Sequence, residues 1–306
     1  MRVLSFDVGI KNLAWCLIES RTVDTIHDPS SYCWGILDWG VWDLRMDIDD
    51  ELYHPECCRE KTSSGKDCKK EPIYVDISNG VSLGGLCKTH YGHCNAPYTS
   101  ENIREVSKMT ITALHKKASD MSINSKGKMK KEIISDICSV ITQRYLCKIP
   151  PLKKAKSITL ADIHDRIIQR LRDIHYTSDI VLIENQPVRM NAAMKSVQMI
   201  LWTTLRDRML QQGVLVPDVR FINANKKLMV VPDDSKWGVT IVDHKIAASM
   251  AKDRKYSERK SESIMRVEKI LCNQSEHLEW FKGHSKRDDL ADCLLMCLFG
   301  AIEKSS

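Results

Sequence analysis

Four acidic residues stand where regular elements are predicted to end or begin. Asp7 and Glu184 each end a short apolar stretch that reads as a buried strand. Asp289 and Asp292 are three residues apart, so both project from one face of the first turn of a predicted helix. A carboxylate is costly to bury unless it is paired, protonated or bound to a cation. A solvated turn or a helix cap explains each residue singly, but four such positions favour a common site.

Convergence of these elements would place four carboxylates in one small volume. Two such charges 4 Å apart repel by about 4 kcal/mol at an effective dielectric constant near 20, so divalent cations are expected to join them. Ligand sets made only of oxygen favour magnesium or manganese over zinc. Two ions about 4 Å apart activate a water and stabilise the leaving oxygen of a phosphodiester. The acidic residues therefore predict phosphodiester hydrolysis with two Mg²⁺ or Mn²⁺ ions.

Clustered cysteines predict a second metal site. Five of the twelve cysteines lie between residues 57 and 94, in a segment poor in large aliphatic residues. In a reducing compartment such clusters are metal ligands more often than disulfides. Tetrahedral zinc takes three cysteines and one histidine, and we expect one structural Zn²⁺ here, with uncoordinated thiols as the alternative. The expected ligands are Cys58, Cys68, Cys87 and His90, with Cys57 as an alternative to its neighbour Cys58 and with His93 and Cys94 in reserve.

The predicted elements form a core that a long insertion interrupts. We expect a core of residues 1–44 and 158–306, and an insertion, 45–157, made of a zinc-finger-like module (about 55–97) and a basic helical segment (about 101–157). Strands are predicted at 2–7, 13–18, 34–44, 179–184 and 219–224, the first three as an antiparallel meander. Helices are predicted within 101–147 and at 190–212 and 243–271, and the motif 286–292 runs into 293–301 as an amphipathic final helix. Thr159 is the predicted N-cap of one more helix, with Asp162 three residues later. The methionine-rich stripe of helix 190–212 is expected to be core, with part of it as a dimer surface.

The distribution of charge predicts a polyanionic partner. The net charge is +6, yet residues 101–160 alone hold 13 Lys and Arg against 5 Asp and Glu. A merely soluble basic face is the alternative. The lysines expected to contact DNA are Lys126, Lys128, Lys130, Lys131, Lys153, Lys154, Lys226 and Lys255.

Composition predicts a soluble protein. The chain is 43% hydrophobic and 28% charged, and no apolar run approaches the roughly 20 residues that span a bilayer. The sequence begins directly with a predicted strand, so no signal peptide and an intracellular, reducing compartment are expected.

Three motifs carry a specific resemblance. They are Ser-Phe-Asp-Val-Gly-Ile-Lys-Asn (5–12), Ile-Glu-Asn-Gln (183–186) and Lys-Arg-Asp-Asp-Leu-Ala-Asp (286–292). Together they resemble the RuvC-like Holliday junction resolvases, in particular their branch in poxviruses and other large DNA viruses. The matched blocks are 1–44 and 158–303.

The resemblance implies an α/β, RNase H-like fold: a mixed five-stranded sheet flanked by helices. It implies that Asp7, Glu184, Asp289 and Asp292 ligate two magnesium ions, with Asp288 as a neighbour. It also implies a lysine at the scissile phosphate, best matched by Lys227 with Lys226 as the alternative. The family acts on four-way DNA junctions as homodimers, here through the helix from Met190, without a small-molecule cofactor. For a viral protein, the host's cytoplasmic replication site or nucleus would be the place of action.

Other functions match parts of the sequence. An actin-like phosphotransferase shares the opening Asp-x-Gly-x-x-Asn but needs a second glycine-rich loop and an adenosine motif, which the sequence lacks. A non-catalytic junction-binding protein would not need carboxylates at all four places. A nuclease of the same fold acting on flaps or RNA–DNA hybrids remains open, because the insertion of more than 100 residues could restrict or extend the substrate range.

Overall fold

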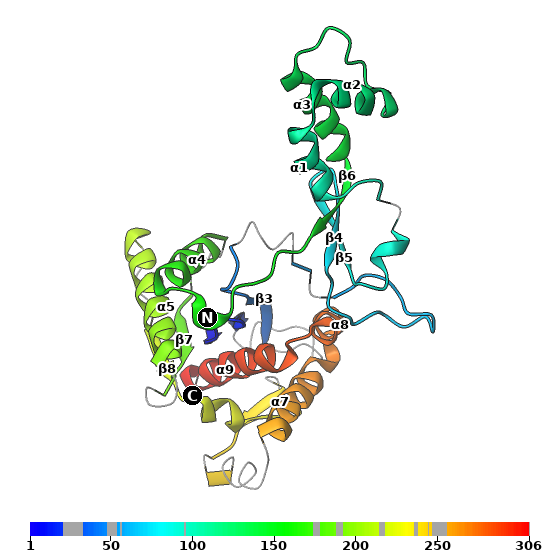
Figure 1. The fold of residues 1–306 in the computed structure, drawn as a ribbon. Helices are drawn as coiled ribbons and strands as arrows, with labels where there is room; N and C mark the ends of the chain where they lie inside the picture. The colour runs from blue at the N-terminus through cyan, green and yellow to red at the C-terminus, as the bar shows by residue number, and fades with distance from the viewer. Residues whose placement is uncertain are drawn as a thin grey trace. The chain divides into compact units, whose positions relative to one another are not determined.

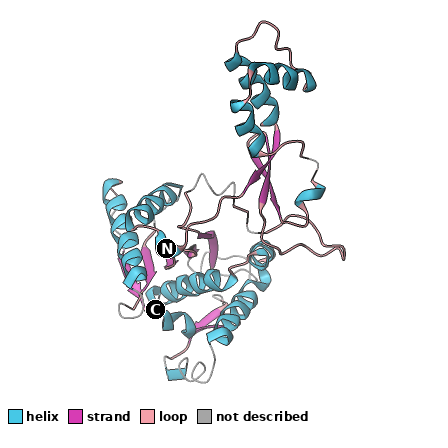
Figure 2. Ribbon diagram, in the orientation of Figure 1, coloured by secondary structure: helices cyan, strands magenta, loops and turns pink. Residues whose placement is uncertain are grey.

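The structure is a computed structural model of the chain (Figures 1 and 2), and it divides into two compact units. One unit comprises Met1–Met46 with Lys153–Ser306, and the other comprises Asp47–Leu152. The structure describes residues 1–20, 33–47, 54–55, 57–94, 96–173, 178–187, 192–213, 218–235, 238–243, 245–246 and 256–305.

A mixed five-stranded sheet forms the centre of the first unit. Its order is β3-β2-β1-β7-β8, in which β1, β2 and β3 pair antiparallel and β7 runs parallel to both β1 and β8. The strands are β1 (Arg2–Asp7), β2 (Leu13–Ser20), β3 (Trp34–Trp42), β7 (Ile180–Glu184) and β8 (Asp218–Ile222). The predicted meander and the predicted mixed sheet are confirmed.

Helices cover both faces of this sheet (Figure 1). They are α4 (Leu160–Asp173), α5 (Ala192–Gln211), α7 (Tyr256–Ile270), α8 (Ser275–Gly283) and α9 (Arg287–Ser305). Side chains alternate along a strand, so Val3 packs in the cluster of α9 while Leu4 and Phe6 pack with α4 and α5. By the same alternation Asp7 and Glu184 lie on the α9 side of the sheet.

Helix α9 packs closely on the sheet and is tied to it by hydrogen bonds. The Ser5 hydroxyl donates to the backbone oxygen of Cys293 at 2.8 Å, and Trp39 Nε1 donates to that of Leu290 at 3.2 Å. A Cβ at Gly300 would lie 2.5 Å from Leu182 Cδ1, so the absence of a side chain permits this approach. These contacts determine where the acidic first turn of α9 meets the sheet.

The structure confirms two local predictions: the N-cap of α4 and the buried stripe of α5. The Thr159 hydroxyl accepts from the backbone N–H of Asp162 at 3.1 Å, and the Asp162 carboxylate accepts from the Thr159 N–H at 3.3 Å. The stripe on α5 is core, as expected, with Val197, Leu201 and Leu205 buried. Met190, the predicted start of this helix, lies outside the described residues.

The described residues of the second unit form a three-stranded sheet and, between its second and third strands in the sequence, three α-helices, as the ribbon shows (Figure 2). The elements are β4 (Tyr74–Ser78), β5 (Val81–Leu86), α1 (Ser100–Lys108), α2 (Ile111–Asp120), α3 (Lys130–Ile141) and β6 (Arg144–Lys148), with the sheet order β5-β4-β6. Buried Val106, Leu114 and Ile137 join the three helices in one apolar cluster.

Several predicted boundaries were wrong, and tertiary pairing explains the largest error. Residues 144–147, expected to be helical, form β6 because they pair with β4, a strand almost seventy residues earlier that was not predicted. Within the predicted helix 243–271, Asp243 is not helical and follows the short strand β10 (Val239–Ile241), which pairs with β9 (Val230–Pro232), whereas Lys245, Ile246 and α7 (Tyr256–Ile270) are helical. Residues 247–255 lie outside the described part. Among the described residues, no helix is long and apolar enough to cross a membrane.

Candidate active site

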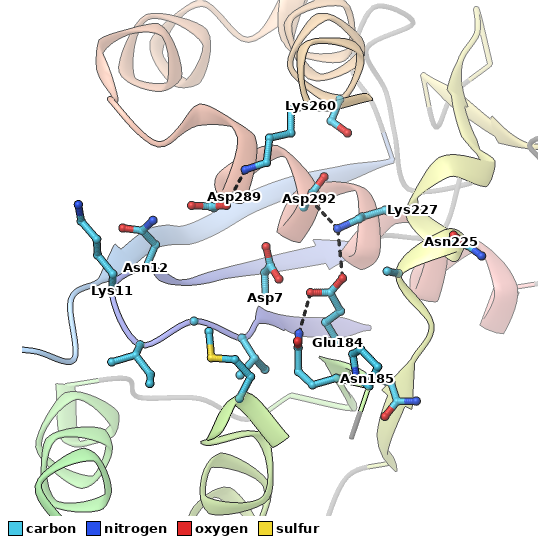
Figure 3. A pocket seen from close by; sticks show the side chains of 18 of the residues that line it. Asp7, Lys11, Asn12, Glu184, Asn185, Asn225, Lys227, Lys260, Asp289 and Asp292 are labelled. Atoms are coloured by element: carbon cyan, nitrogen blue, oxygen red, sulfur yellow. Dashed lines mark hydrogen bonds and ion pairs between the residues drawn. The ribbon is translucent and has the colours of Figure 1, made fainter. Parts of the chain in front are cut away.

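Four acidic side chains from three elements line one cavity of about 500 Å³ (Figure 3). Asp7 ends β1 and Glu184 ends β7; these strands are parallel neighbours with Phe6 opposite Ile183, so their carboxyl ends lie side by side. Helix α9 supplies Asp289 and Asp292 from the same side of the sheet. The structure therefore brings together the four carboxylates that the sequence singled out.

Lys227 bridges two of these carboxylates. It lies in the 3-10 helix Ala224–Met229, directly after β8. Its Nζ is 3.3 Å from Glu184 Oε1 and 2.5 Å from Asp292 Oδ2 (Figure 3). Lys226, the alternative from the sequence, instead places its Nζ 4.9 Å from the ring centroid of Phe299 and does not line the cavity.

Burial and mutual repulsion dominate the electrostatics of the acidic residues. Burial raises the pKa of the Asp7 carboxyl well above its usual range, and its hydrogen bond to Glu184 and the charge of Glu184 act in the same direction. Burial also raises the pKa of Asp292, against the opposing effect of Lys227, and that of Asp289, where the charge of Asp288 adds to it.

Hydrogen bonds and the lysine ammonium reverse this trend at Glu184. Burial would raise its pKa, but the hydrogen bond from Asp7 and the charge of Lys227 lower it below the usual value. The pKa of Lys227 is raised because Asp292, Asp7 and Glu184 together outweigh the burial that disfavours its charge. The cavity thus holds an ionised Glu184 beside a charged lysine.

The chemistry of these donors fits divalent cations. All four acidic groups offer oxygen, the donor that Mg²⁺ and Mn²⁺ prefer. Glu184, Asp289 and Asp292 have side chains only 11%, 17% and 17% exposed, and the ammonium of Lys227 already takes a bridging position between two of them. Lys227 contributes one positive charge to this group of carboxylates. A divalent cation would contribute two and would reduce the remaining repulsion between them.

One residue that the sequence analysis did not assign to the site is Lys260. It lies on α7, lines the cavity, and contacts Asp288 and, at 3.9 Å, Asp289 (Figure 3). Asp288 itself does not line the cavity. Helical spacing carried a signal for Lys260, because the apolar residues Ile264 and Val267 follow it four and seven residues later and so share its face of a predicted helix.

The lysines predicted to contact DNA lie in several places. Those of the second unit are exposed beside the start of α3, where Lys128 also pairs with Asp136 at 2.7 Å. Lys255 lies outside the described residues. The exposed side chains are Lys126, Lys128, Lys130, Lys131, Lys153 and Lys154.

The second unit gathers the three cysteines and the histidine of the predicted zinc site. The candidate ligand atoms of Cys58, Cys68, Cys87 and His90 all lie within 4.8 Å of one another. Cys57 is exposed, and Cys94 instead lies with its Sγ 3.5 Å from Asp76. The alternative ligand Cys57 and the reserve ligands His93 and Cys94 therefore do not belong to this cluster.

The separations in the cluster match tetrahedral zinc. A Zn–S bond of about 2.3 Å implies sulfur atoms roughly 3.8 Å apart. Cys68 and Cys87 have their Sγ atoms 4.0 Å apart, and His90 Nδ1 lies 3.3 Å from Cys58 Sγ and 3.5 Å from Cys87 Sγ. Hydrogen bonds from the backbone of His90 and Thr89 outweigh burial and lower the pKa of Cys87 to about 6. These four side chains could bind zinc.

Comparisons with known proteins give distant similarities. No family model matches the chain. An uncharacterised protein, L451, of Acanthamoeba polyphaga mimivirus is 25% identical over 325 residues, covering 96% of this chain and 73% of the viral protein. The crystal structure of the yeast mitochondrial Holliday junction resolvase Ydc2 matches with 14% identity and a TM-score of 0.39, covering 97% of this chain and 77% of that one.

Proposed function

We propose that this chain is a metal-dependent endonuclease that cleaves four-way and other branched DNA junctions. The observation that carries the proposal is the convergence of Asp7, Glu184, Asp289 and Asp292 on one cavity, with Lys227 between two of them. The three sequence motifs that resemble the RuvC-like resolvases contain all four of these acidic residues.

The proposed fold is RNase H-like. Its support is the sheet of three antiparallel strands continued by two parallel ones, which sets the ends of β1 and β7 side by side. In this arrangement the long segment between β3 and α4 would be an insertion into the nuclease core, and the second unit, Asp47–Leu152, lies within that segment.

The proposed roles follow from the positions of the side chains. Asp7, Glu184, Asp289 and Asp292 would hold two Mg²⁺ or Mn²⁺ ions. Ions bound there would supply an activated water and stabilisation for the leaving oxygen. Lys227 holds its ammonium between Glu184 and Asp292 and is thus placed to stabilise negative charge on a phosphate that enters the cavity.

The exposed lysines would bind the DNA backbone outside the cavity. Each phosphate contact contributes a slope of about −0.9 to the dependence of log K on log salt concentration. Replacing Lys126, Lys128, Lys130 and Lys131 together by glutamine should therefore reduce the slope for junction binding by roughly 3 to 4. An unchanged slope would remove this surface from the proposed interface.

The proposal also covers the zinc site, the oligomeric state and the biological context. Zinc at the Cys/His cluster would be structural, because the segment around it has little apolar core of its own. A homodimer through α5 would present two cavities to the two strands that a symmetric junction cut requires. The mimivirus relative supports a viral context for this activity.

The test uses purified protein and a labelled, immobile four-way DNA junction, with magnesium or with EDTA. Paired symmetric nicks that need the metal and disappear in Asp7→Asn are the expected result. Asp120→Asn, at the end of α2, serves as the matched control, since this exposed carboxylate does not line the cavity. Cleavage of only a flap or an RNA–DNA hybrid would move the function to another nuclease, and tight binding without any cleavage would contradict catalysis.

A further inference from the structure

Hydrogen bonds connect the interior of α5 to Glu184. Gln198 lies on α5 and its side chain is fully buried. Its Oε1 accepts from the backbone N–H of Gln186 at 2.9 Å and from Nζ of Lys195 at 3.1 Å. The side-chain Nε2 of Gln186 donates in turn to Oε2 of Glu184 at 3.2 Å. The buried Gln198 amide is thus connected to the Glu184 carboxylate by hydrogen bonds through one residue, Gln186.

The orientation of the Gln198 amide follows from its partners. Both neighbouring groups are donors, so the oxygen of the amide and not its nitrogen must face them. Nε2 of Gln198 then finds no acceptor within the described part of the chain. Leaving a buried N–H group unpaired is destabilising, and a leucine of similar size would avoid this penalty. Packing alone therefore gives a poor account of a glutamine at this position.

The connection after β7 is held from both sides. The backbone N–H of Asn185 donates to the oxygen of Ile222 at 2.8 Å, which extends the pairing with β8 by one residue. The next backbone N–H, that of Gln186, is held by Gln198. Lys195 also bridges the two sides, since its Nζ lies 3.0 Å from Asn185 Oδ1.

Each oxygen of the Glu184 carboxylate consequently has its own donor. Lys227 contacts Oε1 at 3.3 Å and Gln186 contacts Oε2 at 3.2 Å. Two donors on different oxygens oppose rotation of the carboxylate. The Gln186 amide is neutral and would not compete electrostatically with an incoming cation, whereas the Lys227 ammonium would, and the hydrogen bond from Asp7 comes from a carboxyl that is itself a proposed metal ligand.

We propose that Gln186 and Gln198 are positioning residues that set the orientation of the Glu184 carboxylate for a divalent metal ion. This inference rests on the metal-holding role proposed above for Glu184. Partners that hydrogen-bond a ligating carboxylate typically contribute 10- to 100-fold to metal affinity. Gln186 acts by direct donation, and Gln198 acts by holding the backbone from which that donor extends.

The test measures Mn²⁺ binding in the absence of DNA, by the electron paramagnetic resonance signal of the free ion. Gln186→Met removes the donor to Glu184 and should weaken binding about 10- to 100-fold. Gln198→Leu should weaken binding in the same direction. Gln198→Glu keeps an acceptor for the Gln186 N–H and for Lys195 and should bind nearly as the wild type does. Gln143→Met, at an exposed position of the second unit, is the matched control.

Two results would overturn the inference. One is wild-type affinity in Gln186→Met, a half-buried position whose replacement leaves the core intact even if Gln198→Leu fails to fold. The other is an equal loss in Gln198→Leu and Gln198→Glu, which would show that size and not the acceptor matters. A wild type that binds Mn²⁺ but cuts no junction would contradict the proposed nuclease while leaving this inference standing, and one that binds no Mn²⁺ would contradict both.

Discussion

Replacing Lys227 by methionine should separate the folding role of this residue from its proposed catalytic role. In the structure its ammonium is the contact that Glu184 and Asp292 share, and its side chain is only 13% exposed. The variant keeps the length of the side chain and removes the charge. We expect a large loss of stability in EDTA, a recovery with divalent metal, and no recovery of junction cleavage.

The magnitude follows from the two contact distances. At an effective dielectric constant near 20, unit charges at 2.5 and 3.3 Å attract by about 5 to 7 kcal/mol each, before desolvation is subtracted. Removing one partner of a buried ion pair typically costs about 3 to 5 kcal/mol, because the other charge is left uncompensated. That range is the expected decrease in the free energy of unfolding of Lys227→Met in EDTA.

Divalent metal should offset this loss. A ligand that binds only the folded state adds about 2.7 kcal/mol at one hundred times its dissociation constant. The gain should be larger in Lys227→Met than in the wild type, since no ammonium then competes for Glu184 and Asp292. Calcium, which need not support cleavage, is a suitable ion for the stability measurement.

Urea unfolding followed by tryptophan fluorescence is the appropriate assay. All seven tryptophans lie in the unit formed by Met1–Met46 and Lys153–Ser306, so the signal reports on the unit that contains the cavity. Lys226→Met is the matched control: it removes a neighbouring lysine whose contact with the Phe299 ring contributes only about 0.5 to 1 kcal/mol. The reasoning would be refuted if, in EDTA, Lys227→Met unfolded at the same urea concentration as the wild type. It would also be refuted if calcium did not reduce the loss in the free energy of unfolding.

Three further predictions concern other sites. Asp289→Asn should reduce junction cleavage at least as much as the loss of a metal ligand's hydrogen-bond partner does, about 10- to 100-fold, whereas Asp288→Asn, which does not alter the lining of the cavity, should retain activity; similar rates in quantitative cleavage assays would contradict the assignment. Metal analysis should find about one zinc per chain, lost in Cys87→Ser; a folded wild type without zinc would exclude the site. Burial raises the pKa of Asp76, but hydrogen bonds from Arg144 and Arg59 hold it below its usual 3.8, so its contribution to stability is present above that pH and is lost as the pH falls through the lowered pKa. Hydrogen exchange of the β4 amides should show this acid loss, and an unaltered profile in Asp76→Asn would count against it.

Local patterns were sufficient to predict much of the first unit. The alternation and length of the apolar runs predicted β1, β2, β7 and β8 to within two residues at each end, because buried strands need apolar side chains. The Thr159 cap and the buried stripe of α5 were also predictable from the sequence, since both depend on residues three or four positions apart. The local patterns predicted the antiparallel meander of the first three strands, and the resemblance implied the complete five-stranded mixed sheet.

The pairing of strands that are distant in the sequence could not be predicted in this way. Strand β6 looked helical because Ile133, Ile137 and Ile141 of α3 precede it with helical spacing, and nothing local marks where that spacing stops. Its partner β4 has the buried Asp76 at its centre. This carboxylate can be buried there because Arg59 and Arg144, from other segments, form ion pairs with it at 2.7 and 2.9 Å. Such compensation depends on tertiary contacts.

The sequence by itself determined the kinds of chemistry that this protein holds: oxygen ligands at strand ends, sulfur and imidazole ligands in the insertion, and a surplus of lysine beside them. Residue type decides donor chemistry, and spacing decides which side chains share a face. Only the tertiary structure decided which groups meet. It placed Lys227 rather than Lys226 in the cavity, added Lys260 from α7, and connected Gln198 to Glu184 through Gln186, because these contacts join residues of separate elements whose distance is determined by packing on the sheet.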